Sequence, residues 1–137
     1  MSRRLDGRVI LPGAARGRVL RLQRPISFWG GVDPDSGRIT DPRHPDHGQV
    51  VAGRILAIPA TIGSSSSSAV LLELLRNGRA PAALLLGAMD AILVLGVVVG
   101  RELGYPVIPV LTLTPEQLAA LPAEGEVTVT ESGRIAT

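Results

Sequence analysis

The sequence predicts a single mixed α/β domain over residues 1–137, and three observations support this fold class. Segments with the composition of buried strands alternate with helical segments through the middle of the chain. Both ends of the chain carry short segments typical of β-strands, and no internal repeat is visible. The length and the 45% hydrophobic content suffice for one core, which must be aliphatic because the chain has one Trp, one Tyr and one Phe.

The first third of the chain is predicted to contain two short strands, over residues 9–11 and 18–22. In the second of these, apolar and basic residues alternate imperfectly, which suits a half-exposed strand. Residues 27–48 are dense in Gly, Pro, Asp and Ser, so we expect a long loop rich in turns. Loops of this length inside a domain are often functional.

The middle of the chain predicts a strand, a helix and a second strand. A buried strand over residues 54–58 is followed, after the serine run, by a helix over residues 69–76 with its apolar side chains on one face. Gly78 can take the left-handed conformation that ends a helix. Residues 80–87 then form another buried strand.

The last third contains one ambiguous segment, residues 89–103. Its β-branched run would suit a strand, but its length and Asp90 as a candidate N-cap favour a helix. We expect a strand over residues 105–113, a short helix over 114–121 opened by a capping box, and a hairpin over 126–137.

Composition excludes several classes of protein. Without cysteine, this chain can hold neither a disulfide nor a cysteine-ligated metal or iron–sulfur cluster, and we expect a cytoplasmic protein. The net charge is only +2, and the arginines form no dense patch with stacking aromatics, so we expect no nucleic-acid partner. Residues 80–100 are apolar, but Pro81, Gly87 and Asp90 interrupt them, so we expect no membrane span.

Five consecutive serines, Ser64 to Ser68, lie between the strand and the helix. A flexible linker would have polar flanks, whereas these flanks are a buried strand and an amphipathic helix. Capping the helix accounts for one serine, not five. The third interpretation is an anion site, because Gly63 permits close backbone approach and a helix N-terminus offers free N–H donors. No Lys follows at P-loop spacing.

Three motifs together resemble the small subunit, or swivel domain, of the aconitase X family. They are Trp-Gly-Gly-x-Asp-Pro-x-x-Gly from Trp29 to Gly37, Gly63-Ser64-Ser65, and the "LLELLRNG" that ends at Gly78. The resemblance extends over about residues 6–110.

The resemblance implies a swivelling β/β/α barrel, as in the mobile domain of aconitase, and a hydro-lyase. It implies a separate large subunit that carries the cysteines and an iron–sulfur cluster, in agreement with the absence of cysteine here. Members of the family dehydrate cis-3-hydroxy-L-proline or mevalonate 5-phosphate.

The resemblance also assigns roles to the serine run. Ser64 takes the position of the base, and Ser65, with the backbone N–H groups of Ser65 and Ser66, would hold the substrate anion beside Gly63. Many family members have Arg just before Gly-Ser-Ser, where this chain has Ile62. Because a phosphorylated substrate needs more positive charge, we favour cis-3-hydroxy-L-proline over mevalonate 5-phosphate.

A hypothesis of another class is a non-catalytic anion-binding or scaffold domain. It would use the same serine loop without chemistry.

The turn-rich loop supplies further candidates for the cleft. We expect Trp29 to be a packing anchor that braces the Gly30-Gly31 turn near the serine loop. Asp33 is most simply a turn former, although its loop could line the cleft. The His-x-x-His spacing within Asp41, His44, Asp46 and His47 could bind a metal, but in a Pro-rich loop we expect a solvated turn and no metal on this chain.

Overall fold

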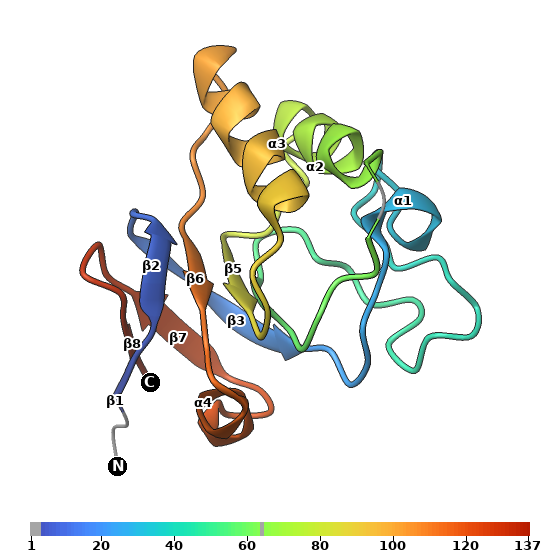
Figure 1. Ribbon diagram of the computed structural model, residues 1–137. Helices are drawn as coiled ribbons and strands as arrows, with labels where there is room; N and C mark the ends of the chain where they lie inside the picture. The colour runs from blue at the N-terminus through green and yellow to red at the C-terminus, as the bar shows by residue number, and fades with distance from the viewer. Residues whose placement is uncertain (1–3, 64) are drawn as a thin grey trace.

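Four parallel strands form the centre of the fold. The computed structural model describes residues 4–63 and 65–137. The parallel strands, in spatial order, are β3 (Ala15–Arg21), β4 (Ile55–Ile58), β5 (Ala83–Leu86) and β6 (Val110–Thr112). A helix follows each of them along the chain: α1 (Phe28–Gly31), α2 (Ser67–Arg76), α3 (Ala91–Glu102) and α4 (Pro115–Ala120). Figure 1 shows α2 and α3 side by side on one flank of the sheet, with α4 at its far end.

Antiparallel strands extend the sheet on both sides until the chain joins its two edges. On one side β2 (Arg8–Leu11) pairs with β6. On the other side β7 (Glu126–Val129), β8 (Arg134–Ala136) and β1 (Arg4–Asp6) follow β3 in turn. Only Gly7 separates β1 from β2, and its N–H donates to the carbonyl of Gly133 at 2.9 Å. The sheet is therefore closed by one continuous segment, which confirms the expected barrel-like α/β fold.

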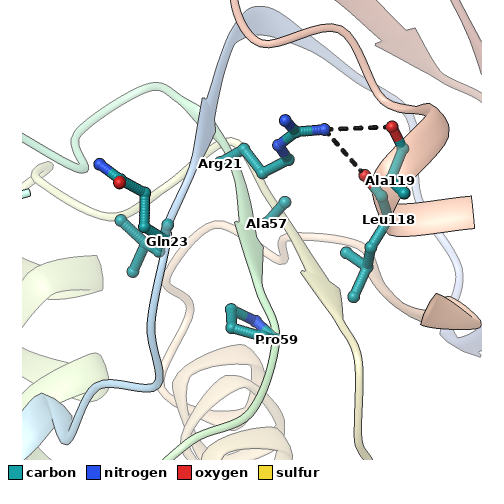
Figure 2. A pocket seen from close by; sticks show the side chains of 7 residues that line it. Arg21, Gln23, Ala57, Pro59, Leu118 and Ala119 are labelled. Atoms are coloured by element: carbon teal, nitrogen blue, oxygen red, sulfur yellow. Dashed lines mark hydrogen bonds between the residues drawn. The ribbon is translucent and has the colours of Figure 1, made fainter.

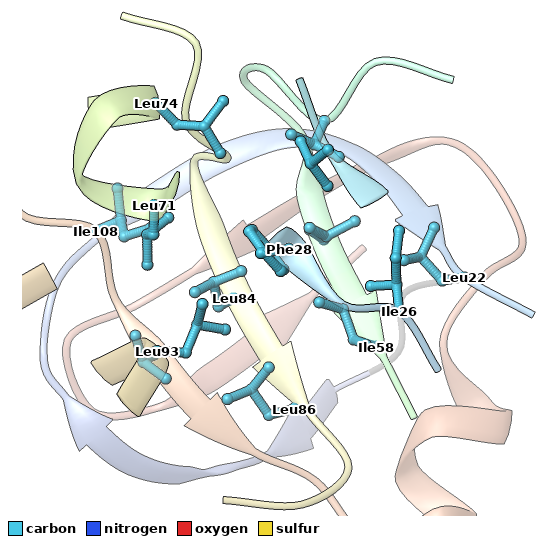
Figure 3. Close-up of a cluster of buried hydrophobic side chains, with 14 of the residues drawn as sticks. Leu22, Ile26, Phe28, Ile58, Leu71, Leu74, Leu84, Leu86, Leu93 and Ile108 are labelled. Atoms are coloured by element: carbon cyan, nitrogen blue, oxygen red, sulfur yellow. The ribbon is translucent and has the colours of Figure 1, made fainter. Parts of the chain in front are cut away.

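Two hydrophobic cores lie on the two faces of the central strands. Side chains alternate between the faces of a strand, and every residue of β4 and β5 is buried. Ile55, Ala57 and Leu85 belong to the core inside the barrel. Leu56, Ile58, Leu84 and Leu86 instead meet the helices and Phe28, as Figure 3 shows for several of them. The central strands β4 and β5 are thus buried on both faces of the sheet, and the loops that lead to α2 and α3 start from these two strands.

Glycines bring α3 into close contact with α2. A Cβ at Gly96 would lie 2.8 Å from the carbonyl oxygen of Ser68, and one at Gly100 would lie 3.0 Å from Cδ1 of Leu75. Within the described residues, no helix has both the length and the apolar character that crossing a membrane requires.

The predicted elements appear in the predicted order, with changed boundaries. The helix interpretation of residues 89–103 is confirmed, as are the Asp90 N-cap and the capping box before α4. The strand predicted over residues 105–113 is shorter, because only Val110–Thr112 pairs as a strand. The prediction missed β1, and it placed the residues of α1 in a long loop.

Candidate functional site

The serine loop (residues 59–66) connects β4 to α2 at the carboxyl edge of the parallel strands. Loops that follow parallel strands meet at this edge, where open α/β sheets bind ligands. Gly63 and Ser65 are exposed, and Ser66 takes the N-cap position of α2. Ser68 donates from its hydroxyl to the carbonyl of Ser65 at 3.1 Å. Ser64, the predicted base, lies outside the described residues.

Hydrogen bonds hold the serine loop on two sides. The Ile62 N–H donates to the carbonyl of Ile26 at 2.9 Å, and the Thr61 hydroxyl donates to Oδ2 of Asp90. The other carboxylate oxygen of Asp90 accepts the N–H groups of Ile92 and Leu93 at 3.0 and 3.1 Å, so Asp90 joins the loop to the start of α3. These bonds anchor Thr61 and Ile62, so the part of the loop before Gly63 does not behave as a flexible linker.

A hollow of about 320 Å³ lies beside the serine loop. It is lined by Pro25, Ile26, Ser27, Trp29, Gly30, Gly31, Asp41, Pro42, Arg43 and Ile62. The structure therefore brings the predicted Trp-Gly-Gly segment next to Ile62. Trp29 is 61% exposed, so its interpretation as a packing anchor is wrong, and Phe28, which is 1% exposed, fills that role. Gly30 makes the turn at a φ of 81°, which favours glycine.

Arg43 is a cation in this hollow that the sequence analysis did not single out. Its side chain is 95% exposed, and its Nε lies 4.0 Å from Oδ1 of Asp41, which already accepts the backbone N–H of Arg43 at 3.0 Å. The guanidinium is thus available to an anionic ligand. No spacing in the sequence signals this, because Arg43 is 19 residues from Ile62.

His44 fixes the segment that carries Arg43. Its Nε2 lies 3.1 Å from the carbonyl of Arg24, and its Nδ1 accepts the N–H of Asp46 at 3.0 Å. With Nδ1 as the acceptor of that N–H, Nε2 is the nitrogen that can donate to the Arg24 carbonyl. The expected solvated turn is wrong for His44, which is buried, although His47 is exposed. In the part of the chain that the structure describes, no three His, Asp or Glu side chains are grouped to hold a metal.

Asp33 is a turn former, as predicted. Its carboxylate accepts hydrogen bonds from the Ser36 hydroxyl at 2.7 Å and from the N–H of Asp35 at 3.2 Å. The Ser36 hydroxyl, followed by the Asp35 N–H, lowers the pKa of Asp33 below its ordinary value, because both bonds stabilise the ionised carboxylate. Asp33 does not line the hollow beside Ile62.

A second hollow, of about 430 Å³, lies near Pro59 at the start of the serine loop (Figure 2). Its cation, Arg21, donates from Nη1 to the carbonyls of Leu118, Ala119 and Leu121 at 3.2, 3.2 and 3.0 Å. Leu118 and Ala119 lie in the last turn of α4 and Leu121 is its C-cap, and a positive charge stabilises this end of a helix. Arg21 therefore holds α4 against the barrel.

Both the sequence and the structure of this chain match those of known proteins. Residues 4–137 match the sequence profile of the aconitase X swivel domain. The chain is 46% identical over 117 residues to the cis-3-hydroxy-L-proline dehydratase of Pseudomonas aeruginosa, covering 84% of this chain and 20% of that enzyme. It is 35% identical over 130 residues to the phosphomevalonate dehydratase small subunit of Thermococcus gammatolerans, covering 92% and 97%.

A solved structure agrees with these matches. The crystal structure of Thermococcus kodakaraensis aconitase X in its holo form superimposes with a TM-score of 0.85 at 34% identity, covering 97% of this chain and 96% of that one. This chain therefore spans about a fifth of the bacterial dehydratase and nearly all of the archaeal small subunit.

Proposed function

Because this chain belongs to the aconitase X swivel-domain family, we propose that it is the swivel subunit of a two-chain hydro-lyase that dehydrates a small hydroxy acid. The small subunit of T. gammatolerans, matched over nearly its whole length, supports the two-chain arrangement. The P. aeruginosa enzyme instead contains the matching region and the remaining four fifths of its sequence in one chain. We expect the complex in the cytoplasm, with a large subunit that contains cysteines.

The observation that carries the proposal is the anchored serine loop at the carboxyl edge of the strands. In the proposed reaction, the Ser64 alkoxide takes the proton from the carbon next to the substrate carboxylate, the electrons of that C–H bond form a C=C bond, and hydroxide leaves from the neighbouring carbon. Ser65 and the N–H groups of Ser65 and Ser66 hold that carboxylate at the positive end of α2. A serine alkoxide needs strong stabilisation, which helix N–H donors and nearby cations supply.

The iron–sulfur cluster expected in this family does not fit this chain. The chain has no cysteine, and the described residues offer no alternative group of ligands. We therefore expect the large subunit to hold the cluster, and no step is assigned to it on this chain.

We favour cis-3-hydroxy-L-proline as the substrate, with mevalonate 5-phosphate as the alternative. Ile62 presents an apolar side chain, 56% exposed, directly before Gly63. Among the described residues that line the hollow with Ile62, Arg43 carries the one cationic side chain. One guanidinium suits the single carboxylate of a zwitterion, whereas a phosphorylated acid presents two anionic groups.

The test combines this chain with a large chain. The partner is the chain of the same organism that matches the part of the P. aeruginosa enzyme outside the swivel region. We expect the mixture to dehydrate cis-3-hydroxy-L-proline faster than mevalonate 5-phosphate. Ser64→Ala should lower kcat by about 10² to 10⁴-fold with the complex intact. Ser132→Ala, an exposed serine in the turn between β7 and β8, is the control in the same run and should retain full activity.

Each negative result refutes a different part of the proposal. A large chain equally active alone would refute the subunit role, and normal turnover in Ser64→Ala would refute that serine as the base. Faster turnover of mevalonate 5-phosphate would reverse the substrate choice. If the serine loop binds carboxylates but no mixture turns over, the non-catalytic alternative holds.

A further inference from the structure

Helix α3 is apolar on every side over most of its length. From Ala91 to Gly100 it contains no polar side chain. Its inner side is buried within the chain, because Leu93 and Val97 lie in the core and Gly96 and Gly100 contact α2. A helix that is hydrophobic all round is normally buried all round. The outer side of α3, however, faces solvent in the isolated chain.

The exposed residues form one stripe. Ile92, Leu95, Val99 and Leu103, here called the α3 ridge, are 36%, 53%, 37% and 57% exposed. Their spacing of three and four residues places them on one helical face, along about 16 Å of helix. The neighbouring helix shows the ordinary pattern, since α2 carries a Glu73–Arg76 ion pair at 3.3 Å on its solvent side.

The α3 ridge begins at the serine loop. Asp90 caps the N–H of Ile92 and also accepts the hydroxyl hydrogen bond of Thr61. The residues adjoining that pair in sequence, Ile62 and Met89, are 56% and 52% exposed. Exposed apolar side chains therefore lie beside the Thr61–Asp90 bond as well as along the outer side of α3.

We propose that the α3 ridge is the surface on which the large chain docks. This inference rests on the proposed function, because a cluster-bearing chain must come to the serine loop to complete the reaction. A large chain that binds at that loop, next to Asp90, also contacts the start of the α3 ridge. In the P. aeruginosa relative, 80% of the protein lies outside the matched region. A partner chain equivalent to that part is large enough to cover the helix. A partner face rich in aliphatic and aromatic side chains fits this surface.

Single charge substitutions on the ridge test the proposal. Val99→Glu and Leu95→Glu place a carboxylate where an apolar partner would bury it, while glutamate keeps the helix propensity high. Val50→Glu is the matched control, since Val50 is 41% exposed and lies outside α3, opposite Arg38 in an isolated bridge. Binding of the isolated chain to the large chain defined above is measured by biolayer interferometry, and self-association by sedimentation.

We expect Kd to rise about 30-fold or more for Val99→Glu and Leu95→Glu, with no such rise for Val50→Glu. Wild-type affinity in both ridge variants would overturn the proposal. So would a dimer of the isolated chain that Leu95→Glu dissociates without weakening the large chain's binding, because a second copy would then be the occupant. The binding assay does not depend on turnover. A complex that depends on the ridge but lacks dehydratase activity would therefore refute the proposed function and leave the docking surface standing.

Discussion

Gly96 allows α3 to lie against the first turn of α2, so Gly96→Ala should displace the end of the serine run. The added Cβ would lie 2.8 Å from the carbonyl oxygen of Ser68 and 3.2 Å from its Cα. Ordinary contact begins at 3.4 Å, and both atoms belong to the backbone, so the two helices must separate by about 0.6 Å, the difference between 3.4 and 2.8 Å. No side-chain rotation can relieve this contact.

Two opposing effects set the magnitude. Overpacking destabilises by about 1–3 kcal/mol, and replacing a helical glycine by alanine stabilises by about 1 kcal/mol. We therefore expect Gly96→Ala to lower the free energy of unfolding by about 1 kcal/mol, or Tm by about 3–4 °C. Gly100→Ala is the matched control, because the three atoms nearest to its Cβ belong to side chains: Cδ1 of Leu75 at 3.0 Å, Cδ1 of Leu72 at 3.5 Å and Cδ2 of Tyr105 at 3.7 Å. These can rotate away, so this variant should be unchanged or up to about 1 kcal/mol more stable.

Urea unfolding followed by far-UV circular dichroism measures the difference between the two variants. Turnover in the complex with the large chain should fall in Gly96→Ala and not in Gly100→Ala, because only Gly96 contacts the backbone of Ser68. Equal stabilisation of both variants by about 1 kcal/mol, the value for propensity alone, would refute the close contact of α3 with α2.

Three further predictions concern the anchors around the site. Asp90→Ala removes the N-cap of α3 and the bond from Thr61, so urea unfolding should show a loss of about 1–2 kcal/mol, with a smaller loss in Thr61→Val; equal losses would mean that the cap contributes nothing. Arg43→Gln should raise KM more than it lowers kcat, because it removes a ground-state anchor, whereas Arg76→Gln on α2 should change neither; an unchanged KM in Arg43→Gln would remove Arg43 from the site. Ser36→Ala should raise the Asp33 titration midpoint, measured by NMR, towards the ordinary value of about 3.9 for an aspartate. Since folding lowers this pKa, the stability from Asp33 is present above the unfolded value and is lost as pH falls through the folded one; an unmoved midpoint would contradict the role of the Ser36 hydroxyl.

Local signals in the sequence predicted the elements that depend on neighbouring residues. Thr114 and Gln117 form the capping box that their spacing indicates, and Asp90 accepts the N–H groups at the start of α3. Each signal acts within a few residues of chain, so no tertiary information is needed. The helix in residues 89–103 followed from its N-cap and length, despite its β-branched run.

Elements that depend on distant partners were missed or overextended. Residues 4–6 have no strand pattern of their own and become β1 because β8 pairs with them. Residues 105–109 read as a strand, but Pro106 and Pro109 lack the N–H that a sheet ladder needs, and pairing begins at Val110.

The sequence by itself determined the α/β class, the order of the central elements and the resemblance carried by the Trp-Gly-Gly and Gly-Ser-Ser motifs. These follow from short-range periodicity, capping and motif spacing. Only the tertiary structure decided that Phe28 is buried while Trp29 faces solvent, that Arg43 lies in the hollow with Ile62, and that none of the described residues covers the outer face of α3. The physical reason is that burial depends on which distant segments the closed barrel brings together, and no local pattern encodes those contacts.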